Sequence, residues 1–241
     1  MQKALGFLLY APLQSWGDIA VGDIRNTYRY PSKSALIGLI SAAMGLDRYQ
    51  DEVQIREINR QLKFAVRVDG RGGAVLPDYH TAQVPPSKKG KVYRTRADEV
   101  EADDLQTILS TREYLCDSAF TVFCFGPIDV LEATRDRLRH PKRNLYLGRK
   151  SCPLAVPCVP EIIEGVDLLH IQAQYGFPNK MRTLSWAPLK EKGEEARIVW
   201  EEGIEAGIAT TTIVRRNDNF ISRALWQFVS RSECVGVVTL P

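Results

Sequence analysis

Tyr114-Leu-Cys-Asp-Ser-Ala-Phe-Thr-Val-Phe-Cys-Phe125 is the clearest strand signal in the chain. Aromatic and β-branched residues dominate this stretch, and they favour a core strand. A short apolar run at residues 3–10 predicts another buried strand, and Phe64-Ala-Val-Arg-Val68 predicts a third. These three runs indicate a sheet at the centre of the fold.

Helical segments are expected between these strands. Ser32 follows Pro31 and predicts the N-cap of a helix, whose buried face carries the apolar residues between positions 36 and 46. Further helices are expected near residues 51–62 and from Ile128. The order strand-helix-helix-strand-strand-helix predicts an α+β fold with helices on one face of the sheet. A ferredoxin-like or RRM-like sheet fits this order, and other α+β folds stay open.

Residues 81–112 interrupt the regular pattern, because Pro85-Pro86 is followed by a basic run and then by an acidic run at 98–104. An irregular excursion of this length within a compact domain is either functional or mobile. Cations with an embedded aromatic residue suit phosphate contact and base stacking. The basic run contains Lys88, Lys89, Lys91, Tyr93, Arg94 and Arg96. We expect the acidic run to be a solvated face rather than a metal site.

The rest of the chain and its composition define the class of protein. Weak strand signals at 198–200, 209–214 and 235–240 predict a small β-rich subdomain over 159–241, after a main domain over 1–158. A chain with 44% hydrophobic and 25% charged residues is ordinary for a globular protein. Its five cysteines include no Cys-x-x-Cys pair, so we expect reduced thiols and no metal, and no motif calls for a cofactor. The first apolar run is too short to span a membrane and lacks a signal-peptide cleavage site, which favours a cytoplasmic protein.

Two segments have the residue types that bind phosphate. At Pro31-Ser-Lys-Ser34 the N-terminus of a helix favours an anion, and Ser32, Lys33 and Ser34 could add contacts. Arg25 and Arg29 lie just upstream, although an ordinary capped helix explains the segment as well. Leu147-Gly-Arg-Lys150 places Arg149 and Lys150 after a glycine, but it lacks the first glycine of a P-loop. A solvated turn is the alternative for this second segment.

Asp78-Tyr-His-Thr81 places His80 beside Tyr79. A histidine with a tyrosine or lysine partner could act on an RNA 2′-hydroxyl without a metal. The chain has only three histidines and no second one nearby, so a structural hydrogen bond is the favoured interpretation. Trp16 is likewise expected to anchor its loop on the core rather than to stack on a base.

Taken together, these pieces resemble the Cas-five-class subunits of the type I-E CRISPR surveillance complex Cascade. The matching pieces follow the family's order, and they are Ala11-Pro-Leu-Gln-Ser-Trp-Gly17, Tyr30-Pro-Ser-Lys-Ser-Ala-Leu-Ile-Gly-Leu39, Phe64-Ala-Val-Arg-Val-Asp69, Asp78-Tyr-His-Thr81, Arg112-Glu-Tyr-Leu-Cys-Asp117 and Leu147-Gly-Arg-Lys-Ser-Cys-Pro-Leu154. Gln227-Phe-Val-Ser-Arg231 resembles the family's tail.

The resemblance implies an RRM-like N-terminal domain with a protruding β-hairpin thumb, here about residues 81–112. It implies binding of the CRISPR RNA (crRNA) 5′ handle in antiviral defence, beside a CasC backbone subunit and a CasA large subunit, with target DNA reached only through the assembled complex. Transferred by position, handle contacts fall on Arg29, Ser32, Lys33, Ser34, Tyr79, His80, Arg112, Tyr146, Arg149 and Lys150.

The resemblance also bears on catalysis. In type I-E systems a separate subunit cuts the precursor RNA, whereas in type I-C systems the Cas-five-class protein is itself the nuclease. The matching pieces at residues 112–117 and 147–153 indicate the type I-E branch. We therefore expect a non-catalytic RNA-binding subunit, and a metal-independent endoribonuclease that uses Tyr79 and His80 is the alternative.

Overall fold

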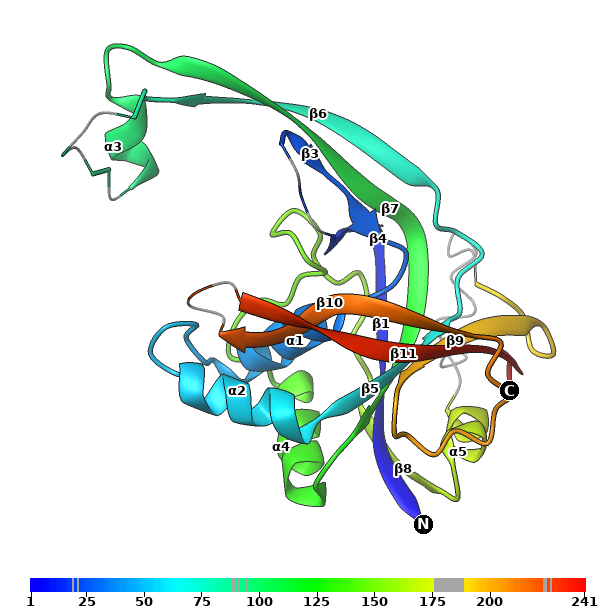
Figure 1. Ribbon diagram of the computed structural model, residues 1–241. Helices are drawn as coiled ribbons and strands as arrows, with labels where there is room; N and C mark the ends of the chain where they lie inside the picture. Colours follow the sequence, from blue (N-terminus) through cyan, green and yellow to red (C-terminus); the bar gives the residue numbers. More distant parts are fainter. Residues whose placement is uncertain are drawn as a thin grey trace.

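One large sheet dominates the fold (Figure 1). The computed structural model describes residues 1–18, 20, 22–87, 90, 92–93, 95–175, 189–222, 225 and 227–241. Within these ranges, nine strands form the sheet, in the order β10-β11-β9-β5-β7-β1-β8, with β3 and β6 beside β7, while β2 and β4 pair separately. The strands are β1 (Gln2–Gln14), β2 (Trp16–Gly17), β3 (Ile24–Arg25), β4 (Thr27–Tyr28), β5 (Lys63–Val68), β6 (Val75–Val84), β7 (Gln106–Phe125), β8 (Glu161–Gly165), β9 (Glu195–Glu201), β10 (Thr212–Ser222) and β11 (Gln227–Thr239).

Strand β1 lies between β7 and β8 in the sheet and has apolar side chains on both faces. It pairs antiparallel with β7 from Ala4 opposite Phe125 to Gln14 opposite Leu115, and with β8 on its other edge. Successive side chains of a strand point to opposite faces, so Phe7 packs in one hydrophobic cluster and Leu8 in another. The predicted strands at 3–10 and 64–68 are confirmed.

Helices cover the two faces unequally. The helices are α1 (Lys33–Met44), α2 (Glu52–Gln61), α3 (Arg96–Val100), α4 (Ile128–Arg139) and α5 (Leu168–Gln174). Side chains of α1, α2 and α4, among them Ile40, Ile55 and Leu131, join the cluster that contains Phe7. Leu168 of α5 joins the opposite cluster. The mixed α+β fold is therefore confirmed, with three helices gathered on one face (Figure 1).

Helix α1 begins where its sequence predicts. The hydroxyl of Ser32 accepts a hydrogen bond from the Ala35 N–H at 3.2 Å, which satisfies one of the helix's unpaired donors. Gly45 ends the helix with φ 82°, a conformation that glycine adopts without steric cost. The cap and the stop thus fix where α1 begins and ends.

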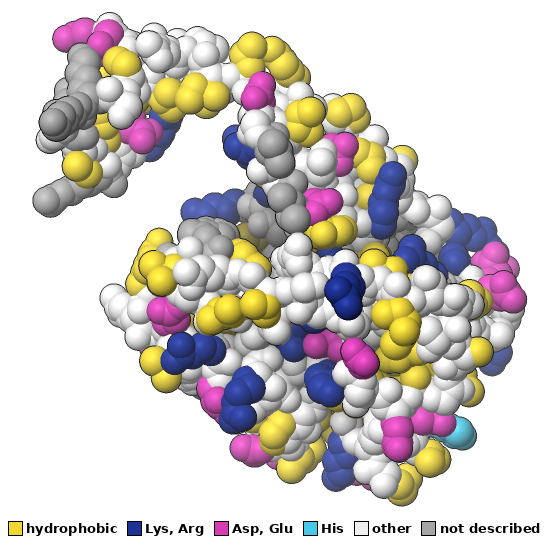
Figure 2. Space-filling view, in the orientation of Figure 1, with side chains coloured by type: hydrophobic (Ala, Val, Ile, Leu, Met, Phe, Trp, Pro, Cys, Tyr) yellow, Lys and Arg dark blue, Asp and Glu magenta, His cyan; other side chains and the backbone are white. Residues whose placement is uncertain are grey.

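Strand β7 is longer than predicted. We expected order to return at Tyr114, but β7 begins at Gln106, and its first half pairs with β6 in unbroken register from Val84–Gln106 to Val75–Leu115. This ribbon, residues 75–84 with 106–115, is called the arm. It projects from the body and ends near α3, with exposed apolar side chains along it (Figures 1 and 2).

The arm begins where β7 changes direction. Asp117 has φ 47°, which is uncommon for a residue other than glycine. The backbone at residues 70–73 pairs across it, because the Gly70 N–H donates to the Ala119 carbonyl at 3.1 Å and the Gly73 N–H donates to the Cys116 carbonyl at 2.9 Å. A Cβ on Gly72 would lie 2.2 Å from the Asp117 carbonyl oxygen, so only glycine allows this approach. The bend separates the buried half of β7 from the half that forms the arm.

The C-terminal strands extend the main sheet. Strand β9 pairs with β5, placing Trp200 opposite Ala65, and β10 and β11 continue outward from β9. Both hydrophobic clusters contain side chains from before and after residue 158. The sheet thus runs across the domain boundary that we predicted, and a separate subdomain over 159–241 stays a prediction.

Three further sequence predictions concern the burial of Trp16, the cysteines and membrane association. Trp16 is 1% exposed and packs edge-on against Phe120, so its predicted role as a core anchor is confirmed. The five cysteines are free thiols. In the part of the chain that the structure describes, none of the helices has the length and apolar character needed to cross a membrane.

Candidate nucleic-acid interface

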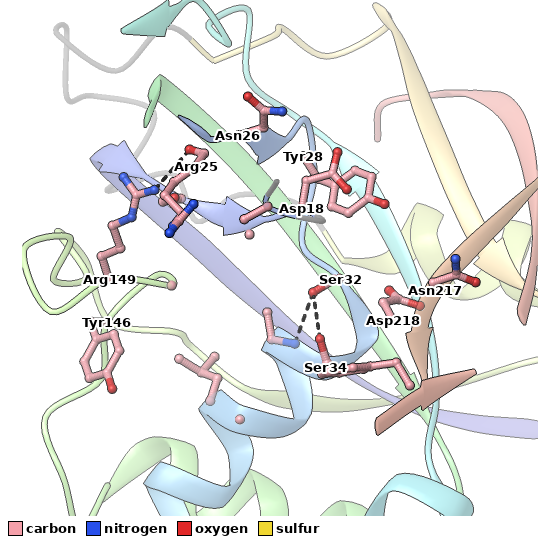
Figure 3. A pocket seen from close by; sticks show the side chains of 18 of the residues that line it. Asp18, Arg25, Asn26, Tyr28, Ser32, Ser34, Tyr146, Arg149, Asn217 and Asp218 are labelled. Carbon is pink, nitrogen blue, oxygen red and sulfur yellow. Dashed lines mark hydrogen bonds between the residues drawn. The ribbon is translucent and has the colours of Figure 1, made fainter. Parts of the chain in front are cut away.

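A pocket of about 570 Å³ lies beside the N-terminus of α1. Its walls come from the loop after β1, from β3 and β4, from the turn at residues 146–149 and from β10 (Figure 3). We call it the α1 pocket. Five predicted site residues line it: Arg25, Ser32, Ser34, Tyr146 and Arg149. Segments far apart in the sequence therefore converge here.

The turn at residues 146–152 is held rigidly against the first loop. The Leu147 N–H donates to the Cys152 carbonyl at 2.7 Å, and the Ser15 N–H donates to the Leu147 carbonyl at 3.0 Å. Gly148 has φ 91°, and a Cβ there would lie 1.6 Å from the Ser15 carbonyl oxygen. The glycine before Arg149 is therefore required by a close backbone approach.

Arg149 connects the wall of the pocket to the arm. Its guanidinium donates to the Glu113 carbonyl at 3.1 Å and to the Arg25 carbonyl at 3.3 Å. It also lies 4.5 Å from the centre of the Tyr114 ring, within the range of a cation–π contact. Arg149 thus fixes β3 beside β7, and its positive charge stays at the pocket wall.

Arg25 lies at the base of the arm, where three strands run side by side. Strand β3 places Arg25 beside Arg112 of β7, and β6 places Asp78 on the other side of Arg112. In the neighbouring row, Tyr79 lies opposite Thr111. The sheet therefore gathers four predicted site residues within three successive rows: Arg25, Arg112, Tyr79 and the following His80.

Tyr79 and His80 differ in their surroundings. The Tyr79 side chain is 65% exposed, which leaves its ring open to a stacking partner. His80 forms a hydrogen-bonded pair with Asp78, two residues earlier on the same strand. This contact is the structural hydrogen bond that the sequence favoured for His80.

The N-terminus of α1 is not a free anion site. The Lys33 N–H donates to Asp218 Oδ2 at 2.8 Å, and Ser32 caps the Ala35 N–H. A carboxylate of the protein itself thus occupies the place where we expected a phosphate. Ser32 is 2% exposed, whereas the Ser34 hydroxyl lies 3.2 Å from that of Ser32 and faces the α1 pocket (Figure 3).

The prediction that the Lys33 ammonium contacts phosphate is wrong. Its Nζ lies 2.9 Å from Glu201 Oε2 and donates to the Leu62 carbonyl at 2.9 Å, and the residue is 6% exposed. The sequence could not indicate this, because Glu201 follows 168 residues later. Lys33 belongs to a buried ion cluster, whose other members are Glu201, Arg216, Asp218, Arg231 and Glu233.

The buried ion cluster links α1 to the last two strands. Arg231 donates to both Asp218 oxygens, at 2.6 and 2.8 Å. Burial alone would raise the pKa of Asp218, but these bonds from Arg231 outweigh it and hold that pKa below its ordinary value. The Tyr30 hydroxyl donates to Glu233 at 2.8 Å, and burial with this nearby carboxylate raises the pKa of Tyr30 to about 12. The cluster fixes one wall of the α1 pocket through Asp218.

Sequence reasoning missed several polar and aromatic residues of the pocket. Asn26 and Tyr28 lie beside Arg25, so a closer look at that loop could have found them. Asn217, Asp218 and Phe228 come from β10 and β11, and no local signal associates them with α1. Amides, hydroxyls and aromatic rings beside cations are the groups that bind unpaired bases and phosphates.

The remaining predicted residues lie elsewhere. Arg29 donates to the Gly73 carbonyl at 2.6 Å near the base of the arm, and Arg96 on α3 donates to Glu99 at 2.7 Å. Tyr93 precedes α3 and is partly buried, and exposed Lys150 lines a second pocket. Four predicted cations, Lys88, Lys89, Lys91 and Arg94, lie outside the described residues. Within the described residues, no group of three metal-ligating side chains comes together.

Comparison with known proteins gives the family. A family model described as "CRISPR-associated protein (Cas_Cas5)" matches residues 4–227. The chain belongs to this Cas5 family of CRISPR-associated proteins.

Within the family, the chain is similar to the "CRISPR system Cascade subunit CasD" of Escherichia coli. The two are 34% identical over 167 residues, which cover 65% of this chain and 70% of CasD. A solved structure described as "CRISPR RNA-guided surveillance complex" matches with a TM-score of 0.63 and 28% identity, covering 98% of this chain and 91% of that one. Another, described as "Crystal structure of Cas protein", matches with a TM-score of 0.56 and 26% identity over 99% and 95% of the two chains. The protein is thus a Cas5-type subunit similar to those of CRISPR surveillance complexes.

Proposed function

We propose that this chain binds the 5′ handle of crRNA as a non-catalytic subunit of a type I-E Cascade complex. The observation that carries the proposal is the convergence of Arg25, Arg149 and Tyr146 on the α1 pocket, directly beside the base of the arm. The pocket supplies cations for phosphates, and its hydroxyl and amide groups suit base edges. A single-stranded handle fits such a surface, because its bases are free to splay and stack.

The strand order supports the assignment of parts within this proposal. The order β5-β7-β1-β8, with α1 and α4, favours a ferredoxin-like or RRM-like unit, and we infer that the arm is the thumb expected at about 81–112. We infer that the arm bends the RNA where the handle meets the spacer. Exposed apolar residues on the arm, such as Ile108 and Leu109, suit contacts with neighbouring CasC and CasA subunits in a cytoplasmic complex.

The endoribonuclease alternative depends on His80. Asp78 engages its Nε2, so His80 has a partner that orients it, and exposed Tyr79 is next to it. Its imidazole would need to reach a 2′-hydroxyl to act as a base. We favour binding, because the pairing of His80 with Asp78 is explained as a structural bond within β6.

A salt titration tests the proposal. Handle-containing single-stranded RNA should bind the full chain with an affinity that falls steeply as salt rises. Arg25→Ala should weaken binding and reduce the slope of log K against log salt by about 1, as expected for one phosphate contact. Arg56→Ala is the matched control, because Arg56 is an exposed cation on α2 that does not line the pocket. Equal slopes for wild type and Arg25→Ala would remove Arg25 from the interface.

A further inference from the structure

A second pocket lies on the other side of the turn that holds Arg149. It has a volume of about 750 Å³ and is lined by the end of α4 and by the proline-containing segment 153–160. We call it the proline groove. Tyr146 lines both the α1 pocket and the proline groove, and consecutive residues of one turn divide between them, Arg149 in the first and Lys150 in the second. A strand that leaves the α1 pocket past Tyr146 would therefore reach the groove.

The charges of the groove differ from those of the α1 pocket. The charged residues that line the groove are two cations, Arg139 and Lys150. The α1 pocket is lined by carboxylates, Asp18 and Asp218, as well as by cations. Exposed Lys150 stands at the rim, and Arg139 donates to the Pro160 carbonyl at 3.1 Å. An apolar floor with cations at its edge matches a ligand with a flat apolar body and a negative group, which is the chemistry of a nucleotide.

The floor of the groove is fixed before any ligand arrives. The backbone of segment 153–160 is hydrogen-bonded to β1. The Leu8 N–H donates to the Cys158 carbonyl at 2.8 Å, and the Ala155 N–H donates to the Tyr10 carbonyl at 3.0 Å. Val159 has φ 45°, a costly conformation for a β-branched residue, and the Tyr175 hydroxyl donates to its carbonyl. A strained segment held in one shape is typical of a preformed binding site.

We propose that the proline groove receives one unpaired base of the bound RNA, stacked on Tyr146, with the adjoining phosphate at Lys150. The inference rests on the proposed RNA-binding function and adds a second base site to it. Tyr146 is 39% exposed at the boundary of the two pockets, and its ring is the aromatic surface that a base needs (Figure 3).

The test combines a variant that fills the groove with an abasic scan of the RNA. Ala155 is exposed and lines the groove, so Ala155→Trp fills it without disturbing the core. The probe is a fluorescein-labelled single-stranded RNA with the repeat-derived 5′ handle, in which each base is removed in turn. With the wild-type full chain, removal of one particular base should weaken binding about 5- to 150-fold, the range measured for one base–aromatic stack. In Ala155→Trp the complete RNA should bind more weakly, and removal of that base should have no further effect.

Matched controls separate the groove from general damage. Ala133→Trp adds the same bulk at an exposed position of α4 outside both pockets, and it should bind like the wild type. Lys150→Ala should weaken binding, whereas Arg137→Ala, which removes an exposed cation outside both pockets, should not. Thermal unfolding of each variant establishes that it is folded.

The outcomes distinguish this inference from the proposed function. If Ala155→Trp binds the complete RNA and every abasic RNA as the wild type does, the groove does not hold a base, although RNA binding through Arg25 stands. If Ala155→Trp keeps its RNA affinity but loses a copurifying subunit, the groove is a protein contact and the inference is overturned. If the wild type binds no RNA at low salt, the proposed function fails, and the inference fails with it.

Discussion

The buried ion cluster and the walls of the two pockets contain the same types of cation, but the cluster buries its lysine and arginines whereas the pockets expose most of theirs. Lys33 and Arg231 are nearly inaccessible and are engaged by Glu201 and Asp218. Arg25 and Lys150 are exposed and lie on the walls of two pockets. In the sequence these four cations look alike, since each has a polar neighbour. Burial, rather than residue type, therefore decides which cation can reach a phosphate.

Removal of a buried partner should have the largest effect. Lys33→Met leaves the Glu201 carboxylate buried without its main cation, which typically costs about 3–5 kcal/mol of unfolding free energy. Chemical denaturation of the full chain measures the loss. The exposed pair between Lys3 and Glu164, at 2.8 Å, is the control, and Lys3→Met should change stability little. Equal losses of unfolding free energy in the two variants would contradict the distinction between buried and exposed cations.

The turn that carries Arg149 should be nearly as sensitive. Gly148→Ala places a Cβ against the Ser15 carbonyl oxygen and forces a left-handed backbone on alanine, with an expected loss of about 1–3 kcal/mol. RNA affinity should fall as well, because the turn positions Arg149 and Lys150. Gly17→Ala is the control for thermal unfolding, since a Cβ there meets open space. An unchanged melting temperature for Gly148→Ala would contradict the rigid turn.

Acidification should weaken the buried ion cluster. Arg231 holds the folded pKa of Asp218 below its ordinary value of 3.8, so the unfolded chain binds more protons at this position. The stabilisation is therefore complete above the unfolded pKa and is lost as pH falls through the folded pKa. Unfolding free energies measured from neutral to acid pH should fall less steeply in Asp218→Asn than in the wild type. Identical slopes would show that Asp218 does not couple folding to protons.

A stacking residue on the arm should give the smallest effect. Tyr79→Ala removes an exposed ring, and handle RNA should bind about 5-fold more weakly, the low end for one stacked base. Tyr49→Ala is the control, because Tyr49 is 67% exposed and lies outside both pockets. Fluorescence anisotropy at a fixed salt concentration measures both. If the two variants bind RNA equally, Tyr79 is not part of the interface.

Local signals predicted the central elements of the fold. The N-cap at Ser32 marks the start of α1 as expected, and the apolar runs predicted β1 and β5. Local signals missed strands β6, β8 and the first half of β7, because β6 and that half of β7 are largely exposed and β8 is short. They pair because partner strands are already in place, which a local pattern does not contain.

The candidate site was predicted only in part, because local patterns do not show which distant segments the fold brings together. Arg25, Ser34 and Arg149 stand in recognisable segments, and the structure brings them to one pocket. Lys33 stands in such a segment as well, but Glu201 and the Leu62 carbonyl hold it inside the protein. Asn217 and Asp218 reach the pocket through the pairing of β10 with β11, so only the sheet topology could have revealed them.

The most direct test of RNA binding without cleavage uses one tube. Purified full chain is incubated with labelled repeat RNA in EDTA, and the sample is divided between a native binding gel and a denaturing gel. We expect a shifted band on the native gel and intact RNA on the denaturing gel, and the same intact RNA with His80→Ala. A discrete cut near the repeat stem that disappears in His80→Ala would contradict this account and make the chain the processing nuclease.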